Sequence, residues 1–287
     1  MTTTRFHHAH MHARGMALVS VLWMVAALSI IATGLTRSIR EEARLMSLAR
    51  QDVQAQALGD AAIQVVLQAI VAGNKPVVQL VQTNVVYKGV SMQVQAMPLN
   101  GLIDINSAGI PLLERLLSVG GGMPPAAAQA IAQAIVDARE RRDAKGIPQR
   151  FEAEEDLLQV PGVDYDLYAR LAALLTADLR GSGKVNPMAA PVEVLAVLAN
   201  GNAGAAIQIA ANREAGQVGV DTSALDANFI DSVTVRRLRI QARVPMADGS
   251  VVRVSRSVDF GARTQDGAPW HTFRTTSGVE PVRRKNS

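Results

Sequence analysis

One uncharged run of residues limits what this chain can be. No charged residue lies between Arg14 and Arg37, and most of residues 15–36 are apolar. A helix rises about 1.5 Å per residue, so this run is long enough to cross a hydrocarbon core of about 30 Å. A cleavable secretory signal would place a small-residue cleavage site after the run, whereas here the run continues into residues 37–70 without a turn former. The sequence predicts a membrane-spanning helix, and Arg5 and Arg14 favour a cytoplasmic N-terminal side.

The same helix is expected to continue well beyond the apolar run. From Leu45 to Ile70, apolar residues recur at steps of three and four among Arg, Glu and Gln. Gly73-Asn74 followed by Pro76 is a helix stop signal, because Gly suits a left-handed cap and Pro cannot extend a helix. Residues 16–74 are therefore predicted to form one long helix with an amphipathic second half.

Two separate regions carry strand patterns. Residues 77–97 hold two Val-rich runs around Lys88-Gly89, and residues 229–244 and 251–260 alternate around Asp248-Gly249. Asp-Gly between alternating runs is a strong hairpin signal. We predict one antiparallel sheet built from residues 75–100 and 221–260 and packed on the long helix.

Basic side chains alternate along the second strand region. They are Arg237, Arg239, Arg243, Arg253 and Arg256. We expect them to line the solvent face of the sheet, where such a row keeps a sheet soluble and discourages edge pairing. A site for an anion or a partner protein is the alternative interpretation.

Residues 101–220 interrupt the two strand regions with a helical pattern. Within them, IDINSAGIPLLERLL at 103–117 resembles KVNPMAAPVEVLAVL at 184–198, and each copy is followed by a second helical segment, at 128–142 and 204–216. Residues 152–175 lie between the copies and contain the turn Val160-Pro161-Gly162-Val163. The chain is therefore predicted to be α+β, with an all-α insertion made of two related halves.

Charge and composition restrict the function of the insertion. Residues 101–220 contain ten Lys and Arg against fourteen Asp and Glu, although the whole chain is basic. DNA binding needs Lys and Arg to release counterions, and Asp164 stands in the hairpin where a phosphate would approach. Arg139, Arg141, Arg142 and Lys145 alternate with acidic residues, which indicates a solvated helix end. We expect an architectural or protein-binding module.

Catalysis has little support in the sequence. The chain has no cysteine, four of its five histidines lie at residues 7–12, and His271 is the fifth. The sequence has no nucleotide-binding Gly-rich loop and no HExxH motif. The histidine cluster at residues 7–12 is interpreted as part of a leader rather than as a metal site. We expect a protein that is not an enzyme.

The N-terminal pattern resembles that of type IV pilins and pseudopilins. A short polar leader, Gly15, an apolar helix and an amphipathic continuation follow one another. The resemblance implies that a prepilin peptidase removes residues 1–15 after Gly15 and methylates Met16. Most pilins carry Glu at the fifth mature position, where this chain has Ser20. A carboxylate in a bilayer is costly unless it is paired, so a subunit without Glu suits a position with no neighbour above it.

The insertion extends this resemblance to one family. IDINSA, LLERLL, AIVDARE, EDLLQVPGV and KVN occur in the order found in general secretion pathway protein K, the GspK family of minor pseudopilins. The resemblance implies a type IV pilin-like fold whose insertion contains repeated helix-hairpin-helix or SAM-like units. It also implies an inner-membrane protein with a periplasmic domain, located at the tip of the type II secretion pseudopilus. The implied partners are minor pseudopilins of the I and J types, the major pseudopilin and the prepilin peptidase, with no nucleic acid.

Two further expectations complete the sequence-based picture. Members of the family can bind calcium, and the candidate ligands in this chain are Glu154, Glu155, Asp156, Asp164 and Asp166. None of them has EF-hand spacing, so a surface acidic run is the favoured interpretation. Residues 261–287 are predicted to form a weakly ordered tail, although Trp270 and Phe273 allow a last strand.

A membrane-anchored DNA receptor of the competence type is the alternative function.

Overall fold

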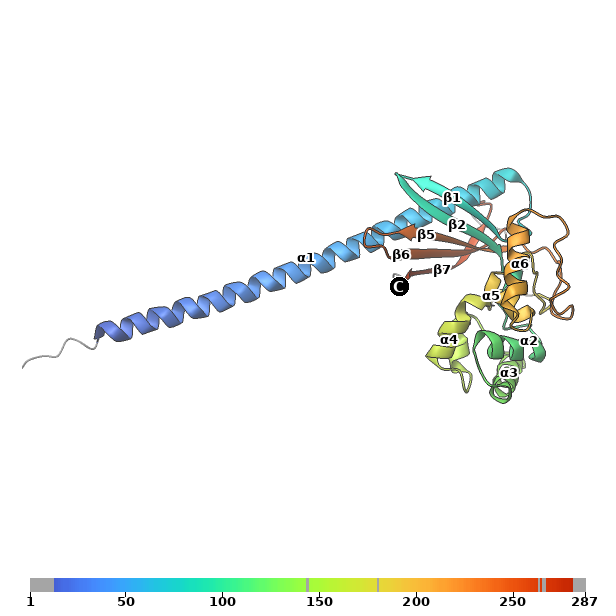
Figure 1. Ribbon diagram of the computed structural model, residues 1–287, viewed down its shortest axis with the longest axis horizontal. Coiled ribbons are helices and arrows are strands. Elements are labelled where there is room, and N and C mark those ends of the chain that lie inside the picture. Colours follow the sequence, from blue (N-terminus) through green and yellow to red (C-terminus); the bar gives the residue numbers. More distant parts are fainter. Residues whose placement is uncertain (1–12, 143–144, 180, 263, 265–266, 281–287) are drawn as a thin grey trace, which may run out of the picture. The chain divides into compact units, whose positions relative to one another are not determined.

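The computed structural model describes residues 13–142, 145–179, 181–262, 264 and 267–280, and for residues 13–17, 30–41 and 43 it describes the backbone alone. The leader's histidine cluster lies outside the described residues. The chain divides into two compact units, Met1–Gln54 and Ala55–Ser287. Helix α1, Ala13–Gly73, runs through the first unit and into the second (Figure 1).

The second unit combines a mixed set of helices with an antiparallel sheet. Its large sheet contains β1 (Val81–Tyr87), β2 (Val90–Pro98), β5 (Arg237–Pro245), β6 (Val251–Asp259) and β7 (His271–Glu280), side by side in that order. All four strand pairs are antiparallel. The insertion between β2 and β5 contains α2 (Ile110–Arg115), α3 (Pro125–Glu140), α4 (Tyr165–Leu171), α5 (Val192–Leu198), α6 (Ala203–Glu214) and a short parallel pair, β3 (Ile103–Asp104) and β4 (Leu175–Thr176). This arrangement is consistent with an α+β, pilin-like fold.

The second half of α1 packs on one face of the sheet. Its buried stripe consists of Ala55, Ala62, Ile63, Val66 and Leu67, which face Met92, Val94, Leu238, Ile240, Ala242, Val252 and Val254 from the strands. At Gly59 a Cβ atom would lie 2.5 Å from Val254 Cγ2, so a side chain there would push the helix off the sheet. The helix ends at Gly73, where Asn74 takes the left-handed conformation with φ 47°.

Both hairpin signals are found in the structure. β1 and β2 are joined through Lys88 and Gly89, which have φ values of 49° and 78°. This pair of positive φ values is what a two-residue hairpin turn requires. Gly249, with φ 83°, lies in the turn between β5 and β6. The sequence pattern therefore predicts the position of both turns.

Two sequence-based expectations need correction. The predicted strand over 229–244 begins only at Arg237, because the earlier residues pack on the insertion, where Val185 bonds to the backbone of Phe229 and Asp231. The tail predicted to be weakly ordered contains β7, which pairs with β6 along its length apart from a register shift at Ser257 and Val258. Antiparallel pairing with β6, the preceding strand, stabilises this segment despite its small polar residues.

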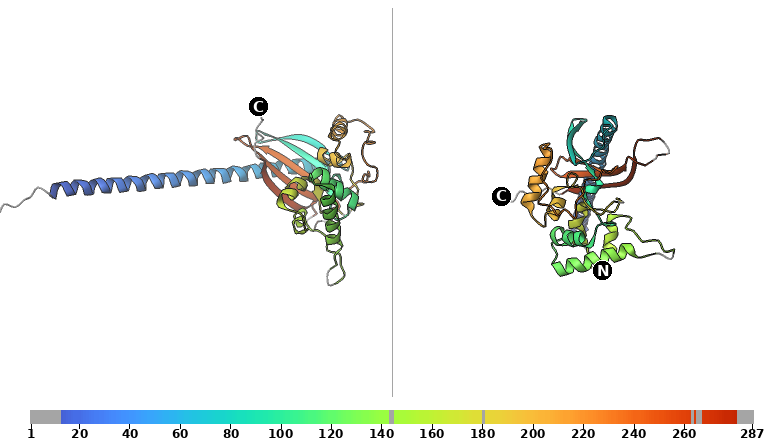
Figure 2. Two further views of the ribbon diagram at one scale, coloured as in Figure 1. Left: turned by 60° about the horizontal axis from the view of Figure 1, so that its bottom comes forward. Right: turned by 90° about the vertical axis from the view of Figure 1, so that its right-hand side faces the viewer.

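The insertion has its own hydrophobic core on the opposite face of the sheet from α1 (Figure 2, right). Each copy of the internal repeat forms a helix pair, α2 with α3 and α5 with α6. The largest core side chains from the two pairs include Leu112, Leu113, Leu116, Leu117, Ile131, Ile135, Leu195 and Leu198. That the halves are helix-hairpin-helix or SAM-like units stays a prediction.

Paired asparagines anchor the two copies of the repeat. Asn106 Nδ2 donates to the carbonyls of Phe151 and Ala177, both at 2.9 Å, and its Oδ1 accepts from Phe151 N. Asn186 Nδ2 donates to Val78 O at 3.1 Å. Each asparagine therefore supplies side-chain hydrogen bonds to backbone groups outside its own segment, which explains why the repeated motif contains Asn.

Candidate functional site

The strongest candidate site is the sheet face that points away from α1, which we call the outer face. Because side chains alternate along strands, the residues between the buried ones form rows across this face. One row contains Met97, Arg239, Ser257 and Arg274; the next contains Gln95, Gln241, Ser255 and Thr276; the third contains Gln93, Arg243, Arg253 and Gly278. The outer face is polar, with arginines in its first and third rows.

The insertion docks on the first row through Glu154. This side chain is 7% exposed, and its Oε1 lies 2.7 Å from Arg239 Nη2. Its Oε2 lies 3.5 Å from Arg274 Nε. A buried carboxylate that contacts two guanidinium groups fixes the position of the insertion against the sheet.

Arg274 has a second carboxylate partner. Its Nε and Nη2 atoms donate to Asp178 at 2.7 and 2.8 Å, which is a bidentate pair. The hydrogen bonds to Asp178 raise the pKa of Arg274 above its ordinary value. The first row is therefore fully neutralised by carboxylates of the insertion.

A groove of about 710 Å³ runs between the outer face and the insertion. The first two rows and Arg253 form its floor, and the segment around α4 and the start of α5 form its walls. Tyr168 stands on the wall, where burial and the nearby carboxylates of Glu155 and Glu154 raise its pKa to about 12. The phenol therefore stays neutral, and its hydroxyl group is hydrogen-bonded to the Glu155 carboxylate.

The third row is neutralised less completely. Arg243 and Arg253 are directly opposite each other on β5 and β6, and both contact Glu280 at the end of β7. Burial and the charge of Arg243 lower the pKa of Arg253. Among the described residues, one carboxylate serves two arginines here.

The structure divides the five arginines predicted to share one face. Arg237, Arg239, Arg243 and Arg253 project to the outer face, but Arg256 faces α1 and lies 2.5 Å from Asp60. The prediction that Arg256 lies on the solvent face was wrong. Arg253 and Arg256 are three positions apart on β6, and residues an odd number of positions apart on a strand project to opposite faces of the sheet. Arg237 is paired with Asp259 at 2.9 Å rather than simply solvated.

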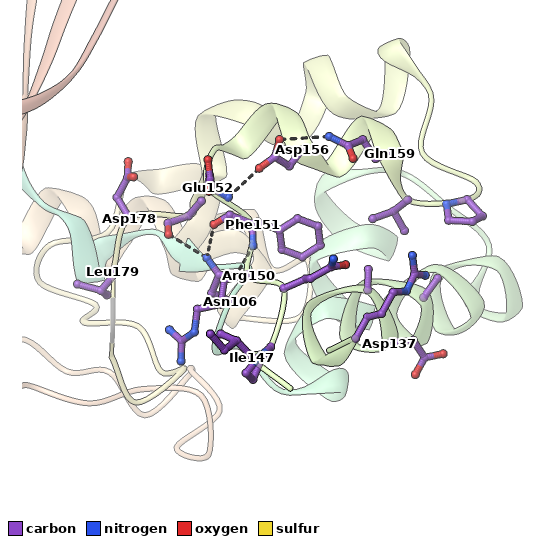
Figure 3. Close-up of a pocket in the computed structure, with 18 of the residues that line it drawn as sticks. Asn106, Asp137, Ile147, Arg150, Phe151, Glu152, Asp156, Gln159, Asp178 and Leu179 are labelled. Atoms are coloured by element: carbon purple, nitrogen blue, oxygen red, sulfur yellow. Dashed lines mark hydrogen bonds between the residues drawn. The ribbon is translucent and has the colours of Figure 1, made fainter. Parts of the chain in front are cut away.

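A second hollow, of about 1020 Å³, lies on the insertion (Figure 3). The Asn106 side chain is bonded to Phe151 at one edge, and Asp156 accepts hydrogen bonds from Glu152 N and Gln159. Ile147 is 59% exposed beside it. Its carboxylates are mostly engaged within the chain, so the hollow has no concentrated charge.

The predicted calcium ligands do not converge in the structure. Glu154 binds arginines, Asp156 accepts from the backbone of its own turn, and Asp164 caps α4 by accepting from Leu167 N at 2.7 Å. Glu155 lies 3.9 Å from Arg274, and Asp166 lies in the first turn of α4. Within the described ranges, no group of three or more His, Asp or Glu side chains is placed to hold a metal. Calcium binding stays a prediction.

The hairpin that resembles a DNA-binding turn is used for packing. Gly162 has φ 90°, and a Cβ atom there would come within 3.0 Å of Ile131 on α3. The neighbouring Asp164 carboxylate caps a helix. Arg139, expected at a solvated helix end, instead donates to the carbonyls of Ile105 and Ala108 at 3.0 and 2.8 Å. The hairpin around Gly162 and the Arg139 side chain therefore make packing and hydrogen-bond contacts within the insertion.

The predicted processing residues lie on α1. Gly15 and Met16 belong to its first turns, where the backbone alone is described, and Ser20 follows on an exposed part of the helix. Within residues 18–29, Leu18, Leu22 and Trp23 are at least 69% exposed. Among the residues with described side chains, the helical stretch Arg44–Gly73 is long and apolar enough to span a membrane. However, 33% of its most apolar 18-residue segment is buried inside the protein. Leu18–Ser29 is a shorter apolar stretch of the same helix.

Sequence reasoning missed Glu280, Asp178 and the docking role of Glu154. The β-forming residues before Glu280, three Thr with Phe273 and Val279, were the available signal for a strand, but nothing local pointed to the two arginine partners of Glu280. Such pairs join residues far apart in the chain, including Asp178 with Arg274.

Comparison with known proteins shows a likeness in fold to a solved structure. No protein-family model matches the chain, and no curated protein sequence matches it. A chain in the crystal structure of the GspK-GspI-GspJ complex from the type 2 secretion system of enterotoxigenic Escherichia coli resembles it with a TM-score of 0.51. The two chains are 15% identical, and the match covers 83% of this chain and 99% of the other. Because the identity is low, the likeness shows the fold alone: the chain has a pseudopilin-like fold.

Proposed function

We propose that this protein is a minor pseudopilin of a type II secretion system and that it initiates or caps the pseudopilus at its tip. It would be held in the inner membrane by the first half of α1, with its second unit in the periplasm, and would promote protein export without catalytic turnover. Its proposed partners are minor pseudopilins of the I and J types and the major pseudopilin.

The fold likeness carries this proposal. It covers 83% of this chain and 99% of a chain from a complex that contains GspK, GspI and GspJ. The five-stranded sheet packed on α1 supports a pilin-like subunit, and an insertion between β2 and β5 agrees with the motif order that suggested the K type.

The lack of a carboxylate at Ser20 supports a tip position. In pilins, the Glu at this point is thought to pair with the terminal amine of a neighbouring subunit. A subunit with no neighbour above it gains nothing from this charge and would have to bury it unpaired in the membrane. Ser20 avoids that cost.

A membrane-anchored DNA receptor is less well supported. The hairpin around Gly162 packs on Ile131, and the Asp164 carboxylate caps α4 at the point that a phosphate would have to approach, so its charge would repel the phosphate. A salt-dependent affinity for duplex DNA would favour this alternative over the pseudopilin.

Intact-mass measurement of the membrane-extracted protein tests the proposal. The full chain is expressed with a prepilin peptidase and, in parallel, without one. We expect loss of residues 1–15 and one added methyl group on Met16 only when the peptidase is present. Substitution of Gly15 should prevent the cleavage, whereas a chain that stays uncut with active peptidase would refute the assignment.

A further inference from the structure

We propose that the groove on the outer face binds an acidic, extended segment of a partner protein. Arg253 on the groove floor and Arg243, which lies opposite it on the neighbouring strand just outside the groove, would form the carboxylate-binding pair. This inference does not depend on the pseudopilin assignment, because it rests on the charges of the third row and on the shape of the groove. The insertion side of the groove carries Glu155 and Glu193, so the ligand carboxylate is expected at the third row and not at that wall.

The two arginine rows differ in the number of carboxylates that they contact. In the first row, Arg239 and Arg274 meet Glu154 and Asp178, and the insertion supplies both carboxylates. In the third row, Arg243 and Arg253 share Glu280. Like charges directly opposite each other on neighbouring strands destabilise a sheet, so a second carboxylate would be favourable at the third row.

The arginines of the third row are accessible to a ligand. The side chains of Arg243 and Arg253 are 47% and 43% exposed, whereas those of Arg239 and Arg274 are 14% and 20% exposed. Arg253 Nε is buried without an acceptor among the described residues, so its hydrogen-bonding capacity is incompletely used. A ligand carboxylate would approach the outer guanidinium nitrogens.

The middle row explains why the ligand is expected to be a polypeptide. Gln95, Gln241, Ser255 and Thr276 form an uncharged floor of donors and acceptors between the two arginine rows. Amide and hydroxyl groups suit the N–H and C=O groups of an extended chain, and the groove volume of about 710 Å³ leaves room for one. The partner segment would lie over this floor and place an Asp or Glu on the third row, as the insertion places Glu154 on the first.

Fluorescence anisotropy with the full chain in detergent micelles tests the proposal. The probe is a short fluorescein-labelled peptide of alternating Glu and Thr, and the matched probe has Gln in place of Glu. We expect the Glu peptide to bind more tightly, and the double substitution of Arg243→Gln and Arg253→Gln to weaken it by about tenfold or more, as expected for loss of charge-assisted hydrogen bonds. Arg150→Gln, which removes an exposed arginine elsewhere on the insertion, should leave the affinity unchanged.

A second variant should increase the affinity for the peptide. A gain of affinity cannot be explained by a loss of folded protein. Glu280→Gln removes the internal competitor of the ligand, so the Glu peptide should bind about three- to tenfold more tightly. Equal affinity for the Glu and Gln peptides, or no response to either the arginine or the Glu280 change, would overturn the proposal. Equally tight, Arg243- and Arg253-dependent binding of a labelled oligothymidylate would overturn the assignment to a peptide, since any anion would then suffice.

Discussion

Glu154 of the insertion and Arg239 of β5 form a 2.7 Å ion pair that is largely shielded from solvent. The two residues are 85 positions apart in the chain. Glu154 also contacts Arg274 of β7, and the two contacts together join the insertion to the sheet. The position of the insertion, and hence the shape of the groove, depends on a carboxylate that lies in a short acidic run.

The first prediction concerns this ion pair. Glu154→Gln leaves Arg239 without a charged partner in a shielded position, so the free energy of unfolding should fall by about 2–3 kcal/mol. The neighbouring change Glu155→Gln is the control, because Glu155 is 55% exposed and 3.9 Å from Arg274; it should cost less than about 0.5 kcal/mol. Urea unfolding measures both, and equal stabilities of the two variants would show that the pair does not hold the insertion.

The second prediction concerns the contact between α1 and the sheet. Gly59→Ala places a methyl group 2.5 Å from Val254 Cγ2, so the helix must shift and the free energy of unfolding should decrease by about 1–3 kcal/mol. Gly73→Ala is the matched control, since nothing lies within 4 Å of a Cβ atom at that position. Thermal unfolding followed by circular dichroism compares the two, and an unchanged transition for Gly59→Ala would contradict this packing.

The third prediction concerns pH. Asp104 is 3% exposed, and burial raises its pKa from 3.8 to about 6, against the opposing effect of its hydrogen bond from Ser107. The folded state therefore binds this proton more tightly than the unfolded state. The contribution of Asp104 to stability is largest below pH about 4 and is lost as the pH rises to about 6, by up to about 3 kcal/mol.

Asp104→Asn isolates this effect. The amide can keep both local contacts, because its oxygen can accept from Asn106 N and its nitrogen can donate to the Ser107 hydroxyl group. The difference in unfolding free energy between the variant and the original chain should grow in favour of the variant as the pH rises from about 4 to about 6. A difference that is constant across this interval would mean that Asp104 does not titrate there.

The fourth prediction concerns Asn106. Asn106→Asp replaces a donor to two carbonyl groups with a carboxylate that repels them, so the free energy of unfolding should fall by about 3 kcal/mol or more. The loop containing Phe151 should also become more sensitive to protease. Asn84→Asp on the exposed strand β1 is the control and should have an effect of less than about 0.5 kcal/mol. Equal protease sensitivity of both variants would contradict a supporting role for Asn106.

Much of the architecture could be read from local patterns. The end of α1, the turns at Lys88-Gly89 and Asp248-Gly249, and the helical nature of the insertion all follow from periodicity and turn chemistry, which act over a few residues. β7 was underestimated because its Thr, Ser and Gly residues form a strand only when β6 provides a pairing partner. Arg256 was misplaced by neglect of strand parity, which the sequence does contain.

The sequence by itself determined that the chain has a long apolar helix, a sheet split by a helical insertion, and an acidic insertion in a basic protein. The tertiary structure alone decided which charges meet: Glu154 with Arg239 and Arg274, Asp60 with Arg256, and Glu280 with Arg243 and Arg253. Turn and helix signals act between neighbouring residues, so they are written locally in the chain. An ion pair instead requires two distant segments to be brought within a few ångströms, and only the packing of the insertion and β7 against the sheet fixes that distance.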